Sequence, residues 1–327
     1  MRGTLVAVVL LLAPGLGTAE TPHATSVLRK VGFSSEDQQR ILDGQFAEAP
    51  LPSTTDRDLA VALAFLVPVG AEDFDRKLIR DSLLIRDDPN TLARGDLQGQ
   101  GSLASFAGLS LSRSERAVYA HASPGKELNF STAELAALKR LGGVESGVDA
   151  ELRKILLGRY QSYRSQGLAG IAPYDRGDSE ATDAAAELRH AGEAARTLEL
   201  LDPAFYQLLR SYPAGRPADL EEVFHWSRYE AHGEPTLILT HSFSSAAGNS
   251  FVFVQRQFYV SRGYDVEQAV AGLIPVKEGT LVVYTNHTFT GEVSGLGGGA
   301  KRSIGERLMA SQLRDLFEKV RASAAQP

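Results

Sequence analysis

The clearest hydrophobic pattern in the chain is a regular alternation between residues 59 and 69. Large apolar side chains occupy the odd positions, and alanines occupy most of the positions between them. A period of two is typical of a β-strand and places the large side chains on one face of a sheet. We therefore predict a strand whose large face meets a hydrophobic core. Its small face is suited to lie under a helix or beside a ligand.

Four further apolar runs lie near the end of the chain, and one long amphipathic helix follows them. The runs cover residues 223–229, 236–243, 251–260 and 280–289, and the helix covers about 300–320. The apolar residues of the helix share one side: Ile304, Leu308, Leu313, Leu316, Phe317 and Val320. The pattern predicts an antiparallel sheet that curls around the terminal helix and leaves a groove between the two.

Residues 131–212 show helical periodicity instead. Ser131 and Glu134 match the capping box, in which each side chain binds the other residue's backbone N–H group. We therefore predict an α+β fold, with a curved antiparallel sheet packed on a long C-terminal helix and a helical insertion at about 131–212. Residues 20–55 are predicted to form an N-terminal helix and linker, and residues 56–327 the α+β domain.

Other segments carry shorter patterns. Residues 105–111 and 116–121 are interpreted as strands, and residues 266–271 as a helical turn. Residues 87–101 are rich in turn-forming residues, and residues 47–55 are interpreted as part of the linker because they contain proline and serine.

The first nineteen residues match a secretory signal peptide. Arg2 supplies a positive start, residues 5–12 form a short apolar run, and Gly17-Thr18-Ala19 provides small residues for a signal peptidase. Cleavage is predicted before Glu20, and the mature protein is predicted to be periplasmic or secreted. No later segment approaches the length of about 20 apolar residues that a membrane-spanning helix needs.

The amino-acid composition limits the reactions and binding partners that can be expected for this protein. The chain contains no cysteine, which excludes disulfides, thiolate metal ligands and cysteine nucleophiles. The formal net charge of −6 argues against a nucleic-acid partner, because phosphate binding favours a basic surface. No Gly-x-Ser-x-Gly motif is present, so the nucleophile turn of α/β-hydrolases is missing. We predict no catalytic residue, no metal ligand and no cofactor from motifs.

The order of the predicted elements resembles the helix-grip architecture of START-like carriers of lipids and hydrophobic ligands. The resemblance covers residues 58–74 and 223–317, with 131–212 as an insertion. Residues 258–264 and 297–305 also resemble segments of a family of uncharacterised exported bacterial proteins, a resemblance that implies no function. The START-like resemblance implies an apolar cavity between the sheet and the terminal helix.

Five polar or aromatic side chains on the apolar strands are candidate ligand-binding residues: His225, His241, Arg256, Tyr284 and His287. A three-residue loop centred on Gly233 would place the first two histidines opposite each other. A two-residue loop would offset them onto opposite faces. If all three histidines converged, their neutral nitrogens could bind zinc. Histidines that make structural hydrogen bonds are the favoured interpretation.

Three hypotheses for function follow. The first is an exported protein that binds an apolar or amphipathic, lipid-like ligand in the groove. The second is a cell-envelope interaction or assembly protein whose helical insertion docks a protein partner. The third is a metal-dependent enzyme that uses the strand histidines. A lipid or hydrophobic small molecule is the expected partner under the first hypothesis.

Overall fold

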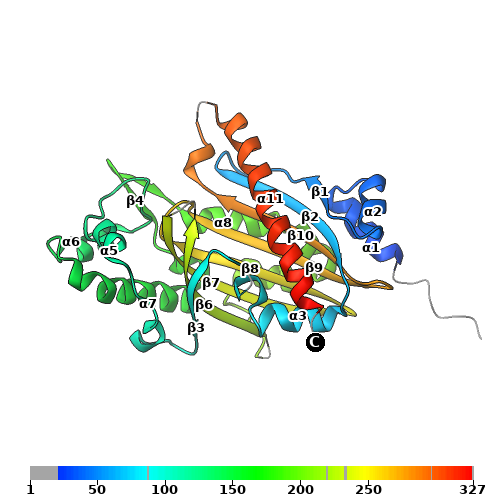
Figure 1. Cartoon of the computed structure of the whole chain (residues 1–327), viewed down its shortest axis with the longest axis horizontal. Helices are drawn as coiled ribbons and strands as arrows, with labels where there is room; N and C mark the ends of the chain where they lie inside the picture. Colours follow the sequence, from blue (N-terminus) through cyan, green and yellow to red (C-terminus); the bar gives the residue numbers. More distant parts are fainter. Residues whose placement is uncertain (1–20, 87, 219, 232–233, 296, 326–327) are drawn as a thin grey trace, which may run out of the picture.

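The protein folds around one large antiparallel sheet, as the computed structural model in Figure 1 shows. The structure describes residues 21–86, 88–218, 220–231, 234–295 and 297–325. The predicted signal peptide and its cleavage site lie outside the described residues. The prediction of fold class is confirmed: the chain is α+β, with a long C-terminal helix and a helical insertion.

The eight strands of the sheet lie in the order β1-β2-β10-β9-β8-β7-β6-β3. Neighbouring strands are antiparallel throughout. Their bounds are β1 Ala47–Pro50, β2 Asp58–Val67, β3 Thr91–Leu97, β6 Glu221–Ala231, β7 Glu234–Ala247, β8 Ser250–Val260, β9 Val266–Val276 and β10 Gly279–Phe289. A separate ribbon consists of β4 Tyr174–Gly177 and β5 Glu180–Thr182.

Helices cover both faces of this sheet. The face that carries α3 (Ala71–Ile79), α4 (Leu83–Arg86) and α11 (Gly298–Ala324) is called the front face, and α11 crosses it diagonally in Figure 1. The opposite, back face carries the N-terminal helices and the insertion. The back-face helices are α1 Thr21–Val31, α2 Ser35–Leu42, α5 Arg113–Ala120, α6 Thr132–Lys139, α7 Val148–Gln166, α8 Ala184–Glu193, α9 Arg196–Leu201 and α10 Pro203–Ser211.

Strand β2 shows why the two faces differ. Its large side chains, including Leu63 and Phe65, pack on the front face with Phe317 of α11. Its small side chains, including Ala62 and Ala64, lie on the back face in one cluster with apolar residues of α1 and α2. The small residues let a helix approach the sheet closely, which is one of the two alternatives that the sequence pattern left open.

Three predicted elements are wrong. Residues 266–271 form part of β9, a central strand between β8 and β10, and not a helical turn. Residues 116–121 belong mostly to α5, which begins with a capping box between Ser112 and Glu115. Residues 105–111 form the end of a 3₁₀ turn (Leu103–Phe106) and a loop. The capping box at residue 112 carries the same sequence signature as the correctly predicted one at residue 131.

Two strands lie in segments that the sequence analysis interpreted as linker and turn. Strand β1 falls in residues 47–55, and β3 falls in residues 87–101. Both are edge strands with one hydrogen-bonded neighbour. Edge strands are buried on fewer sides than central strands, so their sequences need fewer apolar residues and give weaker patterns. In β3, Gly95 leaves room for Trp226, whose Nε1 lies 2.5 Å from an ideal Cβ position on that glycine.

Candidate functional site

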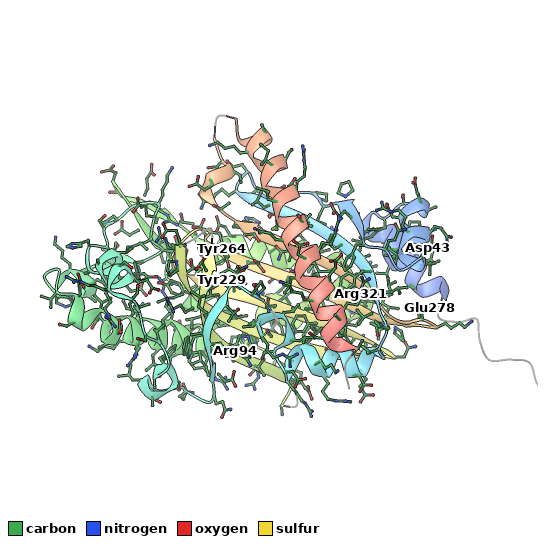
Figure 2. The ribbon with its side chains drawn as sticks, viewed as in Figure 1. Asp43, Arg94, Tyr229, Tyr264, Glu278 and Arg321 are labelled. Carbon is green, nitrogen blue, oxygen red and sulfur yellow. The ribbon has the colours of Figure 1, made fainter. Side chains whose placement is uncertain are left out.

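A cavity of about 730 Å³ lies between α11 and the front face of the sheet. Strands β2 and β6–β10 contribute to its floor, and α11 contributes Leu308, Met309 and Leu313 to its roof. Helix α4 and the residues after it line one side. Figure 2 shows two floor residues, Tyr229 and Tyr264, close together on the sheet beside α11.

The C-terminal part of α11 packs on the front face of the sheet through buried apolar side chains. Phe317 is 3% exposed, and its ring centroid lies 4.8 Å from those of both Phe65 and Tyr284. Val320 and Ala324 are also buried, and α3 packs Phe74 into the same cluster. The cavity runs beneath α11 from Gly305 to Lys319, and the buried residues Phe317, Val320 and Ala324 fix the helix on the sheet beside it.

The floor of the cavity contains buried polar groups without protein partners. Ser227 of β6, Thr240 of β7 and Gln255 of β8 line the cavity and are 5%, 2% and 8% exposed. Their side chains make no hydrogen bond within the part of the chain that the structure describes. Because these side chains line the cavity, a molecule in the groove can form hydrogen bonds with them.

A second part of the floor is an internally bonded polar network. The Asn286 amide donates to the Tyr284 hydroxyl at 3.0 Å, and the Thr288 hydroxyl donates to Asn286 at 2.9 Å. The Tyr264 hydroxyl donates to the Gln257 side chain. Glu267 receives a long hydrogen bond of 3.4 Å from Thr288. Burial raises the pKa of Glu267 to about 7.

The roof combines apolar side chains with Gln312, Asp315 and Lys319, and its N-terminal end is exposed to solvent. Leu308 lines the cavity although it is 58% exposed, and Ile304, one turn earlier, is 59% exposed. Between them, Gly305 brings the helix close to β2, because an added Cβ would lie 2.9 Å from the Leu59 side chain. An apolar helix face that is held in place but not covered can pack against the apolar part of a bound molecule.

The structure places the five predicted site residues on different faces. Tyr284 lines the cavity. His225 also lies on the front face, directly opposite Thr240 in the β6–β7 pairing, but it does not line the cavity. It is 1% exposed, and neither ring nitrogen has a hydrogen-bond partner. Burial lowers its pKa to about 3, so the ring is neutral at pH 7.

His241 and Arg256 lie together on the back face, beneath the insertion. His241 stacks between Phe224 and Phe243, with ring centroids 4.1 and 4.3 Å apart. Its Nε2 donates to the Glu222 carboxylate at 3.1 Å, because a carboxylate can only accept. Its Nδ1 then accepts from the Tyr163 hydroxyl at 3.1 Å. Burial lowers the pKa of His241 to about 4 and keeps it neutral.

Arg256 completes this back-face network. Its guanidinium donates to Gln268 at 2.7 and 3.0 Å, to the Leu209 carbonyl at 3.2 Å and to the Tyr163 hydroxyl at 3.2 Å. The side chain is 0% exposed. Arg256 therefore joins the sheet to helices α7 and α10 and has no access to the cavity.

His287 occupies a third environment. It lies on the back face of β10, where its Nδ1 is 2.9 Å from the Asp58 carboxylate. The three histidines therefore do not converge, and no group of three His, Asp or Glu side chains in the described ranges is placed to hold a metal ion. Ala231 pairs with Glu234, which is the two-residue loop, so His225 and His241 point to opposite faces.

Sequence reasoning missed most of the cavity floor. Gln255, Gln257, Asn286 and Thr288 alternate with residues of the other face on β8 and β10. Their alternation with apolar residues along each strand is the sequence pattern that could have identified them as cavity residues. Glu267 was missed because its strand, β9, was interpreted as a helical turn.

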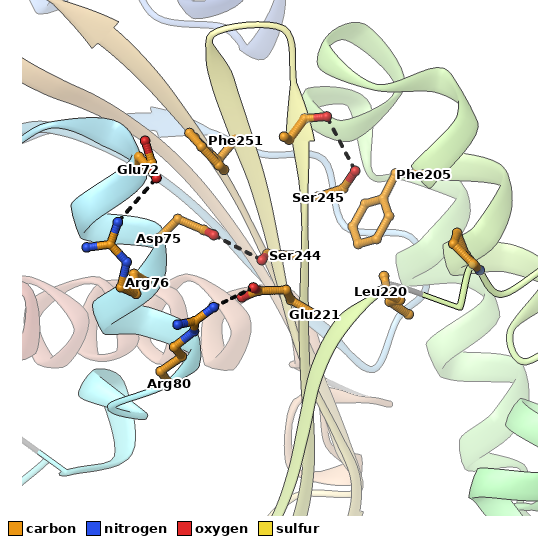
Figure 3. Close-up of a pocket in the computed structure, with 12 residues that line it drawn as sticks. Glu72, Asp75, Arg76, Arg80, Phe205, Leu220, Glu221, Ser244, Ser245 and Phe251 are labelled. Atoms are coloured by element: carbon orange, nitrogen blue, oxygen red, sulfur yellow. Dashed lines mark hydrogen bonds and ion pairs between the residues drawn. The ribbon is translucent and has the colours of Figure 1, made fainter.

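A smaller pocket of about 440 Å³ lies at the other end of the sheet, between α3 and the β7–β8 hairpin (Figure 3). Its charged groups are mostly paired with each other. Arg80 bonds Glu221 at 2.9 Å, and the Ser244 hydroxyl donates to Asp75 at 3.1 Å. Because the protein satisfies most of these groups itself, this pocket is a weaker candidate for ligand binding than the groove.

Asp75 in this pocket gives a prediction for stability against pH. Burial raises the pKa of Asp75 to about 7, from its ordinary value of 3.8. Between these values the folded state keeps a proton that the unfolded state loses, so stability falls as pH rises. We expect Asp75→Asn to reduce the fall in unfolding free energy between about pH 4 and pH 8 by about 1–3 kcal/mol. Urea unfolding across this range measures it. Glu72→Gln, an exposed change on the same helix, is the control, and an unchanged slope in Asp75→Asn would contradict the prediction.

The surface of the insertion offers little apolar area. Among the described residues between 131 and 212, Val144 is the large apolar side chain that stands out as exposed, at 56%. A single exposed side chain does not make the contiguous patch that a docking surface needs. The second hypothesis, docking through the insertion, therefore gains no support from this surface.

Comparison with protein-family models, curated proteins and solved structures finds no match to this chain. None of the helices in the described ranges combines the length and apolarity needed to cross a membrane. The function must therefore be argued from the groove itself.

Proposed function

We propose that this protein binds an amphipathic small molecule in the groove between the front face of the sheet and α11. The observation that carries the proposal is the composition of the cavity walls. Ser227, Thr240 and Gln255 present unbonded polar groups from below. Leu308 and Leu313 present apolar side chains from above. A ligand with one polar and one apolar part would satisfy both walls.

The size of the cavity agrees with this proposal. Small-molecule sites commonly have volumes of about 300–1,000 Å³ and combine apolar walls with a few placed polar groups. The cavity of about 730 Å³ falls in that range. Burial of each CH₂ group of a ligand against the roof would contribute about 0.8 kcal/mol.

The N-terminal sequence supports a further part of the proposal, which is the location of the protein. A basic start, a short apolar run and small residues before Glu20 support export of the protein. The groove would then bind its ligand outside the cytoplasm, in the periplasm or the medium. Mass spectrometry of the mature protein tests this part, and a chain that retains residues 1–19 would contradict export.

The main test is to fill the cavity with protein atoms. Thr240→Phe and Ser227→Phe place an aromatic ring where the ligand is proposed to lie. The proteins are purified without detergent, denatured and extracted, and the extract is examined by mass spectrometry. We expect a small amphiphile at about one per chain in the original protein and at least a tenfold lower amount in both variants, a difference of about 1.4 kcal/mol or more in binding free energy.

The control is Ser165→Phe, which adds the same ring at an exposed position on α7. This control should retain the amphiphile. Circular dichroism of all variants confirms that the sheet is intact. An amphiphile retained equally by the cavity variants and by the control would contradict the proposal, as would its absence from the original protein after growth and purification in detergent-free media.

A further inference from the structure

The charged residues around the cavity are mostly acidic. Half-buried Asp88 and Glu267 lie inside the groove, and three exposed acidic residues lie at its rim: Glu230, Glu292 and Asp315. Lys319 of α11 is the basic residue that lines the cavity among the described residues. Five acidic groups against one basic group give the groove a negative potential, which attracts cations and repels anions.

The carboxylates of Asp88 and Glu267 differ in whether a positively charged side chain lies near them. Lys319 interacts electrostatically with Asp88 and favours its charged form. Glu267 has no basic neighbour among the described residues, and Asp88 is the charged group that acts on it. A carboxylate enclosed in this way is costly unless a positive charge pairs with it. The protein does not supply that charge, so a ligand could.

Three tyrosines and the side-chain amide of Gln255 line the same cavity as Glu267. The electrostatic influence of Glu267 reaches the hydroxyls of Tyr229, Tyr264 and Tyr284, which all line the cavity. The π-face of a tyrosine attracts a cation within about 6 Å of the ring centroid. Gln255, more than nine-tenths buried and without a partner, adds an amide oxygen that can accept from an N–H donor.

We propose that the ligand of this groove is a cationic amphiphile, with an alkylammonium head on the floor at Glu267 and an apolar chain under Leu308 and Leu313. This inference rests on the proposed function of the groove and specifies its ligand class. The head would donate to Glu267 and to Gln255 and lie beside the tyrosine rings. The apolar chain would point toward the open end of the roof, where α11 remains uncovered.

Three probes that share a decyl chain and differ in the charge of the head group distinguish the contribution of charge to binding from that of the apolar chain. They are decylammonium chloride, sodium decyl sulfate and a neutral decyl oligoethylene glycol ether. Each is titrated calorimetrically below its micelle concentration at about pH 8, where Glu267, with a pKa raised to about 7, is ionised. We expect decylammonium to bind at least tenfold more tightly than decyl sulfate, with the neutral ether between them.

Variants locate the interaction. Glu267→Gln should weaken decylammonium binding about tenfold and leave the neutral ether unchanged, because about 1.4 kcal/mol of charge interaction is lost. Glu199→Gln, an exposed carboxylate on the back-face helix α9, is the matched control and should change neither. Thr240→Phe should reduce binding of all three probes.

The outcomes separate this inference from the function on which it rests. If decyl sulfate binds as tightly as decylammonium, or if Glu267→Gln leaves decylammonium binding unchanged, the cationic class is wrong and the groove remains a binding site. If no probe binds, or if Thr240→Phe leaves every titration unchanged, the binding groove itself is wrong.

Discussion

Arg256→Met is expected to lower the free energy of unfolding by about 3–5 kcal/mol, because it strips partners from several buried groups at once. The guanidinium bonds Gln268, the Leu209 carbonyl and the Tyr163 hydroxyl, and methionine can bond to none of them. Urea unfolding measures the loss. Ligand binding by the fraction that remains folded should be unchanged, since Arg256 faces away from the cavity.

Gln255→Met is the matched control, one residue away on the same strand. Its side chain faces the cavity and has no protein partner, so its replacement should change stability by less than about 1 kcal/mol. It should instead weaken binding of the amphiphile. The two neighbouring positions thus separate the structural role of the back face from the proposed binding role of the front face. Equal effects of both substitutions on stability would contradict this division.

Phe317→Ala is expected to remove the anchor of α11. The side chain is 3% exposed and packs between Phe65 and Tyr284, so its loss should cost about 3–5 kcal/mol of stability. Ligand binding should weaken at least tenfold, a change of about 1.4 kcal/mol, because the roof is then no longer fixed over the floor. Thermal unfolding and amphiphile titration measure the two effects.

The control for this prediction lies on the same helix. Leu308 is 58% exposed, so Leu308→Ala should change stability by only about 0.5 kcal/mol or less. Because Leu308 lines the cavity, the substitution should still weaken binding of a ligand with an apolar chain. A stable Phe317→Ala protein with full ligand affinity would show that α11 is not the roof of the site.

Much of the fold could be predicted from local pattern. The alternation of β2, the apolar stripe of α11 and the capping box at Ser131 each depend on residues close together in the chain. Such local signals are enough to predict that these segments form a strand or a helix, and in which order they follow one another. They fail for β9, where Glu267 and Gln268 interrupt the apolar pattern at the start of the strand. That strand is held by β8 and β10 on either side, which no local window contains.

The candidate site was less predictable because the face on which a strand residue lies depends on register. The two-residue connection between Ala231 and Glu234 turns His241 to the back and leaves Thr240 in the groove. A bulge between Leu239 and Thr240 changes the pairing with β8 again. A shift of one residue exchanges the two faces of a strand. Of the five predicted site residues, three therefore lie on the back face and Tyr284 lines the cavity, whereas His225 lies on the front face without lining it.

The sequence by itself determined the α+β class, the strands β2, β6, β7, β8 and β10 and the terminal helix, because periodicity and capping act over a few neighbouring residues. Only the tertiary structure decided which polar side chains share the groove. It also showed that Phe317 anchors α11 at the cavity wall, whereas Ile304 and Leu308 near the N-terminal end of the helix remain exposed. These outcomes depend on strand register, which the hairpin connections and the β7 bulge set, and on where a straight helix meets the sheet. The position of the helix is set by contacts between residues far apart in the chain, such as Phe65 with Phe317.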